Sequence, residues 1–226
     1  VSQGLTFSIT QYVNAFVWRF DATAFQLYPA VLAVSVLIMF LIVSPLHRRF
    51  GKPATAAGAA LVAVTVGFTP YALLLAGAWP APGTDASTFG YYGFVVVANT
   101  AGIVTLISAA SMVAEIVEVF QERTGRRAEG SFYAGNWLVQ KCATGAGIFL
   151  AGQVVATAGI PQGAIPGAVP EGSLATMIWL YGGASILLAV MTAWFLGRFP
   201  ITRADHEARL SAFDAAARAD PDASIT

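Results

Sequence analysis

The stretch SFYAGNWLVQKCATGAGIFLAGQVVATAG, residues 131–159, contains a single charged side chain, that of Lys141. A helix needs about 20 mostly apolar residues to cross the hydrocarbon core of a bilayer, which is about 30 Å thick. This stretch exceeds that length without a proline and without a second charge. It therefore predicts a transmembrane helix that carries one cation near its middle.

Four further stretches of the chain meet the same criterion of length and composition. They are residues 24–46, 54–79, 89–119 and 174–196. A sixth segment, residues 4–18, is apolar and aromatic but too short to span by itself, so we expect its first turns to be absent. The predicted fold class is an all-α, integral membrane bundle of six helices over residues 1–200. Residues 201–226 are expected to form a short amphipathic helix on the membrane surface and a disordered end.

The overall composition supports the membrane assignment and argues against an enzyme. Only 11% of the 226 residues are charged and 57% are apolar, whereas about 25% of the residues of a soluble domain are charged. The net charge of zero gives no indication of a nucleic-acid partner. One cysteine, Cys142, and two distant histidines provide neither a disulfide framework nor a metal site. We expect no cofactor and no catalytic residue.

Basic residues are present in some connections between the predicted helices and absent from others, in alternation along the chain. The connections 47–53 and 121–129 contain several basic residues, whereas the connections 80–88 and 160–173 contain none. Because positively charged loops stay in the cytoplasm, we expect the basic connections and the C-terminus to face the cytoplasm of a bacterial inner membrane. The basic residues are Arg48, Arg49, Lys52, Arg123, Arg126 and Arg127.

Lys141 is the strongest candidate for a functional residue. A cation at the centre of a bilayer costs between about 2.5 and more than 10 kcal/mol, depending on how it is measured. Such a residue usually faces a water-filled cavity or a partner, although a structural lysine that snorkels to the interface is the alternative. No acidic residue of this chain lies at a comparable depth. We therefore expect its carboxylate partner to come from another part of the protein.

Two pairs of side chains four residues apart are candidates for lining a cavity, because this spacing places both members on one helix face. Trp137 and Lys141 form the first pair, and an aromatic ring beside a cation is typical of sugar recognition. A tryptophan that packs or faces lipid is the alternative. Asn14 and Trp18 form the second, weaker pair. We also assign Gln140, next to Lys141, to the cavity.

The end of the segment 89–119 has a stripe of acidic residues that includes Glu115 and Glu118. Arg126 and Arg127 follow in the next connection. Salt bridges between these groups are candidates for closing a cytoplasmic gate. A solvated charge cluster is the alternative, because exposed pairs contribute only about 0–1 kcal/mol each.

Several of these segments resemble the glycoside–pentoside–hexuronide cation symporters, the melibiose-permease branch of the major facilitator superfamily. The residues that carry the resemblance are SMVAEIVE at 111–118, RTGRRAEG at 123–130, VQK at 139–141 and HRRFGK at 47–52. The block from 111 to 152 is specific, and a weaker likeness extends over residues 4–196. The resemblance implies that these spans are the seventh to twelfth helices of a twelve-helix transporter.

The family resemblance also implies a mechanism and a set of partners. Two six-helix halves would alternate access to a central cavity, each half being an inverted repeat of three helices. Lys141 matches the lysine beside the cation site of the family, and Glu115, Glu118 and Arg127 match its cytoplasmic latch. The implied substrate is a sugar or glycoside. The coupling ion, Na⁺ or H⁺, would bind mainly to carboxylates of the N-terminal half.

One departure from the family pattern keeps other functions open. Trp137 stands where melibiose permease has a threonine, which puts the substrate in doubt. A symporter of lysolipids or other amphiphiles, which resembles the same branch, is the second hypothesis. The third is a six-helix scaffold subunit without transport activity.

Overall fold

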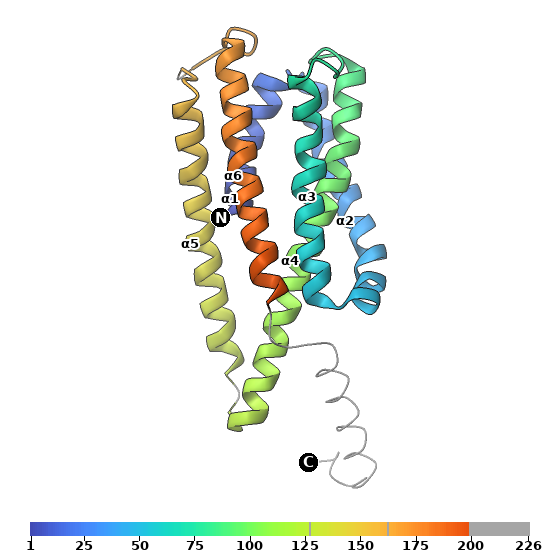
Figure 1. Cartoon of the computed structure of the whole chain (residues 1–226), viewed down its shortest axis with the longest axis vertical. Coiled ribbons are helices and arrows are strands. Elements are labelled where there is room, and N and C mark those ends of the chain that lie inside the picture. The colour runs from blue at the N-terminus through green and yellow to red at the C-terminus, as the bar shows by residue number, and fades with distance from the viewer. Residues whose placement is uncertain (127, 162, 199–226) are drawn as a thin grey trace.

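The computed structural model describes residues 1–126, 128–161 and 163–198. Within these ranges every regular element is helical, and the helices form one upright bundle (Figure 1). Residues 199–226, which include the predicted amphipathic helix, lie outside the described part. The elements are α1 (Ser2–Tyr12), η1 (Val13–Val17), α2 (Ala22–Phe50), α3 (Lys52–Leu75), α4 (Asp85–Thr124), α5 (Glu129–Thr157) and α6 (Glu171–Gly197).

Five of these helices, α2 to α6, are long and apolar enough to cross a membrane. They coincide with the five predicted spans, so the all-α membrane fold is confirmed. The main difference is α4, which extends to Thr124 and carries the acidic stripe on a continuous helix. No proline interrupts α4, and it ends only at Gly125, whose φ of 66° is left-handed and suits a helix C-cap.

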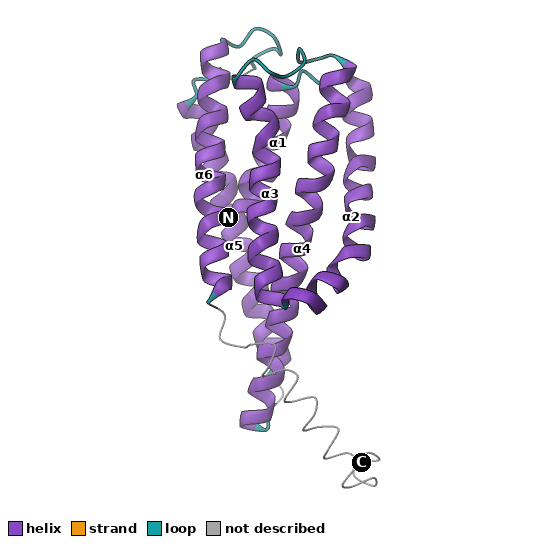
Figure 2. Ribbon diagram, turned by 45° about the vertical axis from the view of Figure 1, so that its right-hand side comes forward, coloured by secondary structure: helices purple, strands orange, loops and turns teal. Residues whose placement is uncertain are grey.

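Short connections join the helices at two opposite ends of the bundle (Figure 2). The α1–α2, α3–α4 and α5–α6 connections lie at one end, which we call the loop end. The α2–α3 and α4–α5 connections lie at the other, which we call the basic end because it holds Arg48, Arg49, Lys52, Arg123 and Arg126. The N-terminus lies about halfway along the bundle, so α1 and η1 occupy the half of the bundle next to the loop end (Figure 1).

Helices α1 and α5 pack with their backbones almost in contact. A Cβ atom on Gly147 of α5 would overlap the carbonyl oxygen of Val1 and the backbone nitrogen of Leu5. A Cβ atom on Gly4 would likewise overlap the carbonyl oxygen of Thr144. Small residues allow this close approach of helices, and it fixes the start of α1 beside the middle of α5.

Aromatic side chains fill the interior at the loop end. Trp18 stacks on Tyr91 with ring centroids 4.5 Å apart, and it also contacts Tyr71 and Trp79 at 5.2 and 5.6 Å. The hydroxyl groups of Tyr71 and Tyr91 are 3.1 Å apart and share a hydrogen bond. This aromatic cluster joins the end of η1 to α3 and α4 and fills the interior of the bundle at the loop end.

Candidate functional site

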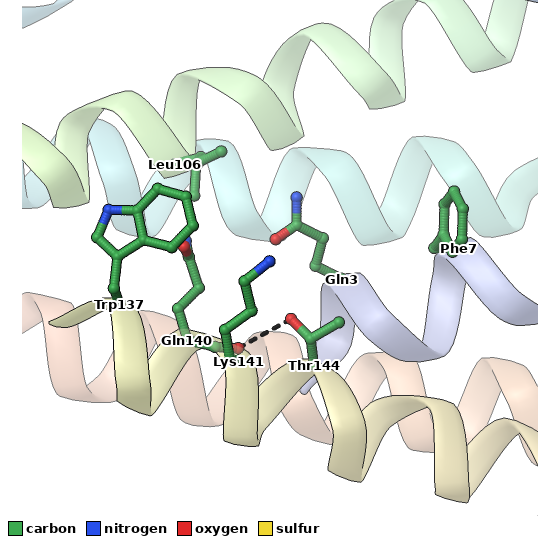
Figure 3. A pocket seen from close by; sticks show the side chains of 7 residues that line it. All are labelled: Gln3, Phe7, Leu106, Trp137, Gln140, Lys141 and Thr144. Carbon is green, nitrogen blue, oxygen red and sulfur yellow. Dashed lines mark hydrogen bonds between the residues drawn. The ribbon is translucent and has the colours of Figure 1, made fainter. Parts of the chain in front are cut away.

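A pocket of about 360 Å³ opens on the side of the bundle between α1, α4 and α5 (Figure 3). Four of its seven lining side chains are polar and three are apolar. The polar ones come from the first turn of α1 and from α5, and the apolar ones come from all three helices. The lining residues are Gln3, Phe7, Leu106, Trp137, Gln140, Lys141 and Thr144.

Lys141 supplies the only charge in the lining of this pocket. It lies twelve residues after the start of α5 at Glu129 and sixteen before its end at Thr157, and therefore near the middle of the helix. Its Nζ atom is 5.3 Å from the centroid of the Trp137 ring, a cation–π contact. Within the described residues, this ammonium makes no ion pair and no hydrogen bond. The predicted pair of Trp137 and Lys141 therefore shares one face of α5.

Trp137 is 58% exposed, similar to Trp179 on α6 at 63%, but only Trp137 lines the pocket. The contact of α1 with α5 at Gly147 and Thr144 places Gln3 and Phe7 beside Trp137 and Lys141, and the pocket lies between these side chains. An open indole face next to amide groups can stack on the apolar C–H face of a sugar ring. The predicted cavity residue Gln140 lines the same pocket.

Four lining residues were not predicted from the sequence: Gln3, Phe7, Leu106 and Thr144. Gln3 and Phe7 are four apart on α1, and Thr144 is three residues after Lys141. The hydroxyl group of Thr144 donates to the carbonyl oxygen of Gln140 at 2.9 Å (Figure 3). The spacing from Lys141 to Thr144 could have indicated Thr144, whereas only the packing of α1 on α5 brings Gln3 into the pocket.

The structure places Asn14 and Trp18 away from this pocket, in the interior of the bundle at the loop end. Their side chains are 0% and 1% exposed. Asn14 lies in η1, where its side chain interacts with the Tyr28 hydroxyl, but no contact of either amide atom meets the geometry of a hydrogen bond. The Trp18 indole nitrogen also lacks a hydrogen bond of acceptable geometry. This second pair therefore contributes to the closed interior of the loop end and not to the Lys141 pocket.

At the basic end, Glu115 is paired with a different cation from the one that we predicted. The Nζ atom of Lys52, at the start of α3, lies 2.5 Å from Oε1 of Glu115. The two side chains are 28% and 11% exposed, so the pair is largely shielded from water. Glu118 and Arg126 form no ion pair within the described residues, and Arg127 lies outside them.

A second polar contact lies beside this ion pair. Nε2 of His47 is 2.7 Å from the hydroxyl oxygen of Ser108, whose own proton is directed to the carbonyl oxygen of Val104 at 2.7 Å. Because the hydroxyl proton is already donated, the histidine nitrogen is the donor in this pair. The two contacts join the α2–α3 corner to α4 at the basic end.

The chemistry of the pocket suits binding more than covalent catalysis. An indole ring, two amides, a hydroxyl group and one ammonium can orient a polar ligand. No group of three or more metal-ligating side chains occurs in the described residues. The lining offers no activated nucleophile beside a general base.

Comparison with known protein families gives one match. The model of the family described as MFS/sugar transport protein matches residues 1–203, and this range includes every helix of the described residues and every lining residue of the pocket. Comparisons with curated proteins and with solved structures gave no significant match.

Proposed function

Because the chain belongs to the MFS/sugar transport protein family of the major facilitator superfamily, we propose that it is the C-terminal half of a cation-coupled symporter for a sugar or glycoside. Membership of this family makes the chain an integral membrane protein with a role in transport and a small-molecule substrate. The melibiose-permease-like branch, the symport mechanism and the coupling ion, Na⁺ or H⁺, are parts of our proposal.

The observation that carries the proposal is the placement of Trp137 and Lys141 together on the open side of α5. An ammonium near the middle of a membrane helix is stable only beside water or a partner, and a substrate pathway provides both. The amides of Gln3 and Gln140 add donors and acceptors for sugar hydroxyl groups, and Trp137 adds a stacking surface.

In this function the pocket would face the N-terminal six-helix half across the central cavity. Carboxylates of that half would bind the coupling cation close to Lys141. Lys141 would then balance their charge when the cation leaves. Coupling follows because the lysine and the cation compete for the same carboxylates.

The ion pair of Lys52 with Glu115 would stabilise one end of this half while the two halves rock against each other. Glu118, Arg126 and Arg127 remain candidates for contacts across the cytoplasmic mouth. Their proposed role is to form salt bridges with the other half when the mouth is closed and to lose them when it opens.

The direct test of the proposal is glycoside uptake by the complete transporter in proteoliposomes, driven by an imposed Na⁺ or H⁺ gradient. We expect Lys141→Gln to abolish accumulation against a gradient. We expect Trp137→Phe to raise the KM for the glycoside, because the stacking surface becomes smaller. Trp179→Phe is the matched control, since Trp179 on α6 is 63% exposed but does not line the pocket. Unchanged accumulation in Lys141→Gln would exclude the proposed role of Lys141.

The apolar part of the pocket favours a second candidate, a symporter of lysolipids or similar amphiphiles. Phe7, Leu106 and Trp137 could contact an acyl chain while Lys141 contacts a phosphate group. Competition binding separates the two candidates. Displacement of a bound glycoside by other sugars but not by lysophospholipids supports the sugar transporter, and the reverse result supports the amphiphile carrier.

A further inference from the structure

The indole ring of Trp137 already has an occupant on the side that faces the pocket. Figure 3 shows the Lys141 side chain between Trp137 and Gln3, with its ammonium inside the pocket. The distance of 5.3 Å from Nζ to the ring centroid is within the range of about 6 Å for a cation–π contact. Within the described residues this ring contact is the only interaction of the ammonium.

A sugar bound in the pocket that stacks on Trp137 needs the ring face that the Lys141 ammonium occupies. Cation–π attraction and sugar stacking both act on the π-electron face of the indole, and one face cannot bind both groups at contact distance. The lysine cannot leave the neighbourhood, because positions 137 and 141 are four apart on one helix and remain about one turn from each other. The ammonium therefore stays close to the indole ring and competes with the sugar for the stacking surface.

We propose that the Lys141 ammonium occupies the Trp137 ring face in the substrate-free transporter, and that a glycoside displaces it on binding. This inference rests on the proposed function and adds the event that links sugar binding to the cation site. The displaced ammonium has to find a new partner, for which carboxylates of the N-terminal half are the matching chemistry. Sugar binding would thus change the charge at the cation site without a direct contact between sugar and ion.

The alternative is that Lys141 binds the sugar directly, by donating hydrogen bonds to its hydroxyl groups. The two roles predict opposite effects when the ammonium is removed. A direct ligand loses affinity for the sugar, whereas removal of a competitor increases it. The expected size of the gain is about twofold to thirtyfold in Kd, from the strength of cation–π contacts between exposed and desolvated sites.

The first measurement is the Kd of the purified complete transporter for p-nitrophenyl glycosides, without coupling cation, by isothermal titration calorimetry. We expect Lys141→Ala to bind the glycoside about twofold to thirtyfold more tightly than the wild type. We expect Lys141→Arg to stay close to the wild type, because a guanidinium also stacks on an indole face. A Kd for Lys141→Ala that is equal to or weaker than that of the wild type would overturn the inference.

The second measurement observes the Lys141 ammonium directly by NMR. Glycoside binding is followed in the protein that retains Lys141, so the result does not depend on how a variant binds sugar. Reductive ¹³C-methylation of the lysines keeps their charge, and Lys141→Arg identifies the Lys141 signal in the NMR spectrum. We expect this signal to be shifted upfield by the ring current of Trp137, and to move towards the position of an exposed lysine when p-nitrophenyl glycoside is added. The Trp137→Leu variant should show the exposed position from the start.

These measurements separate failure of the inference from failure of the proposed function. The wild-type protein could accumulate glycosides while its Lys141 signal shows no upfield shift, or keeps that shift with glycoside bound. Either result would support the proposed function and overturn the displacement step. A wild-type protein that neither binds nor accumulates any glycoside overturns both.

Discussion

Two pairs of side chains in this protein have the same spacing and opposite surroundings. Asn14 and Trp18 are fully buried at the loop end, whereas Trp137 and Lys141 line an open pocket at the middle of α5. Both pairs combine an indole with a polar group four residues away, and the sequence alone assigns both to a cavity. The difference shows that helical spacing establishes which residues share a face but not what that face contacts.

The packing of the neighbouring helices explains why the two surroundings differ. Trp18, which directly follows η1, lies against α3 and α4, whose Tyr71 and Tyr91 cover its ring. On α5, α1 and α4 pack beside Trp137 and Lys141 without covering them, and they leave a pocket that Gln3, Phe7 and Leu106 also line. The first pair should therefore contribute mainly to stability and the second mainly to function.

The largest expected effect is a loss of stability on removal of Trp18, the indole of the buried pair. Trp18→Ala in the complete transporter should lower the free energy of unfolding by about 3–5 kcal/mol, because it removes a fully buried indole from the aromatic cluster. Trp137→Ala should lower it by less than about 1 kcal/mol, since that ring is 58% exposed. Thermal unfolding in detergent measures both. Equal losses for the two variants would contradict the contrast between buried and open indoles.

The two lysines of the chain provide the next comparison. Lys52→Met should cost about 1.5–3 kcal/mol of stability, because Glu115 loses its charged partner while remaining 11% exposed. Lys141→Met should cost less than about 0.5 kcal/mol, since Lys141 has no ion pair to lose within the described residues. The measurement is the same thermal unfolding, and a larger loss for Lys141→Met would show that Lys141 has a structural role.

A pair of glycines on α5 tests the contact with α1 that brings Gln3 into the pocket. Gly147→Ala should destabilise the protein by about 1–3 kcal/mol, because the added methyl group meets the backbone of α1. Gly145→Ala is the control, since no atom lies within 4 Å of its added Cβ, and a gain of up to about 1 kcal/mol from helix propensity is expected there. If both variants had the same melting temperature, α1 and α5 would not pack as the structure shows.

The smallest expected effect concerns the buried amide of Asn14. Asn14→Leu removes a buried polar group that has no hydrogen bond of acceptable geometry, so we expect a change between zero and about 1 kcal/mol of stabilisation. Asn14→Ala, which leaves a cavity, is the control and should destabilise. A clear loss of stability in Asn14→Leu would mean that the interaction of the amide with the Tyr28 hydroxyl stabilises the fold.

Most of the fold could be predicted from the sequence because the lipid phase demands long apolar helices. The five spans are evident from length and the absence of charge, although the span predicted to end at residue 119 continues as α4 to Thr124. The contacts between helices were not predictable in this way, because in a lipid-embedded helix the face that packs is about as apolar as the face that meets lipid. The burial of Asn14 and the contact of Gln3 with the pocket both depend on that missing information.

Within the candidate site, local spacing was informative and distant pairing was not. The contact of Trp137 with Lys141 follows from their separation by one helical turn. The partner of Glu115 is Lys52, which is 63 residues away in the sequence. From the sequence, Arg126 and Arg127 are the expected partners because they are close to Glu115 in the chain. However, α4 continues as one helix to Thr124, and Arg126 forms no ion pair within the described residues.

The most direct test of the account asks whether the Lys141 face of α5 is in contact with water in the complete transporter. Single cysteines at positions 141 and 139, in a background in which Cys142 is replaced by serine, are treated in membranes with a charged, membrane-impermeant thiosulfonate. Val139 is the control because it is 67% exposed and two residues away, on the opposite face of the helix. We predict rapid labelling at 141, slowed by a bound glycoside, and little labelling at 139. Labelling at 139 and not at 141 would place Lys141 against lipid and contradict the account.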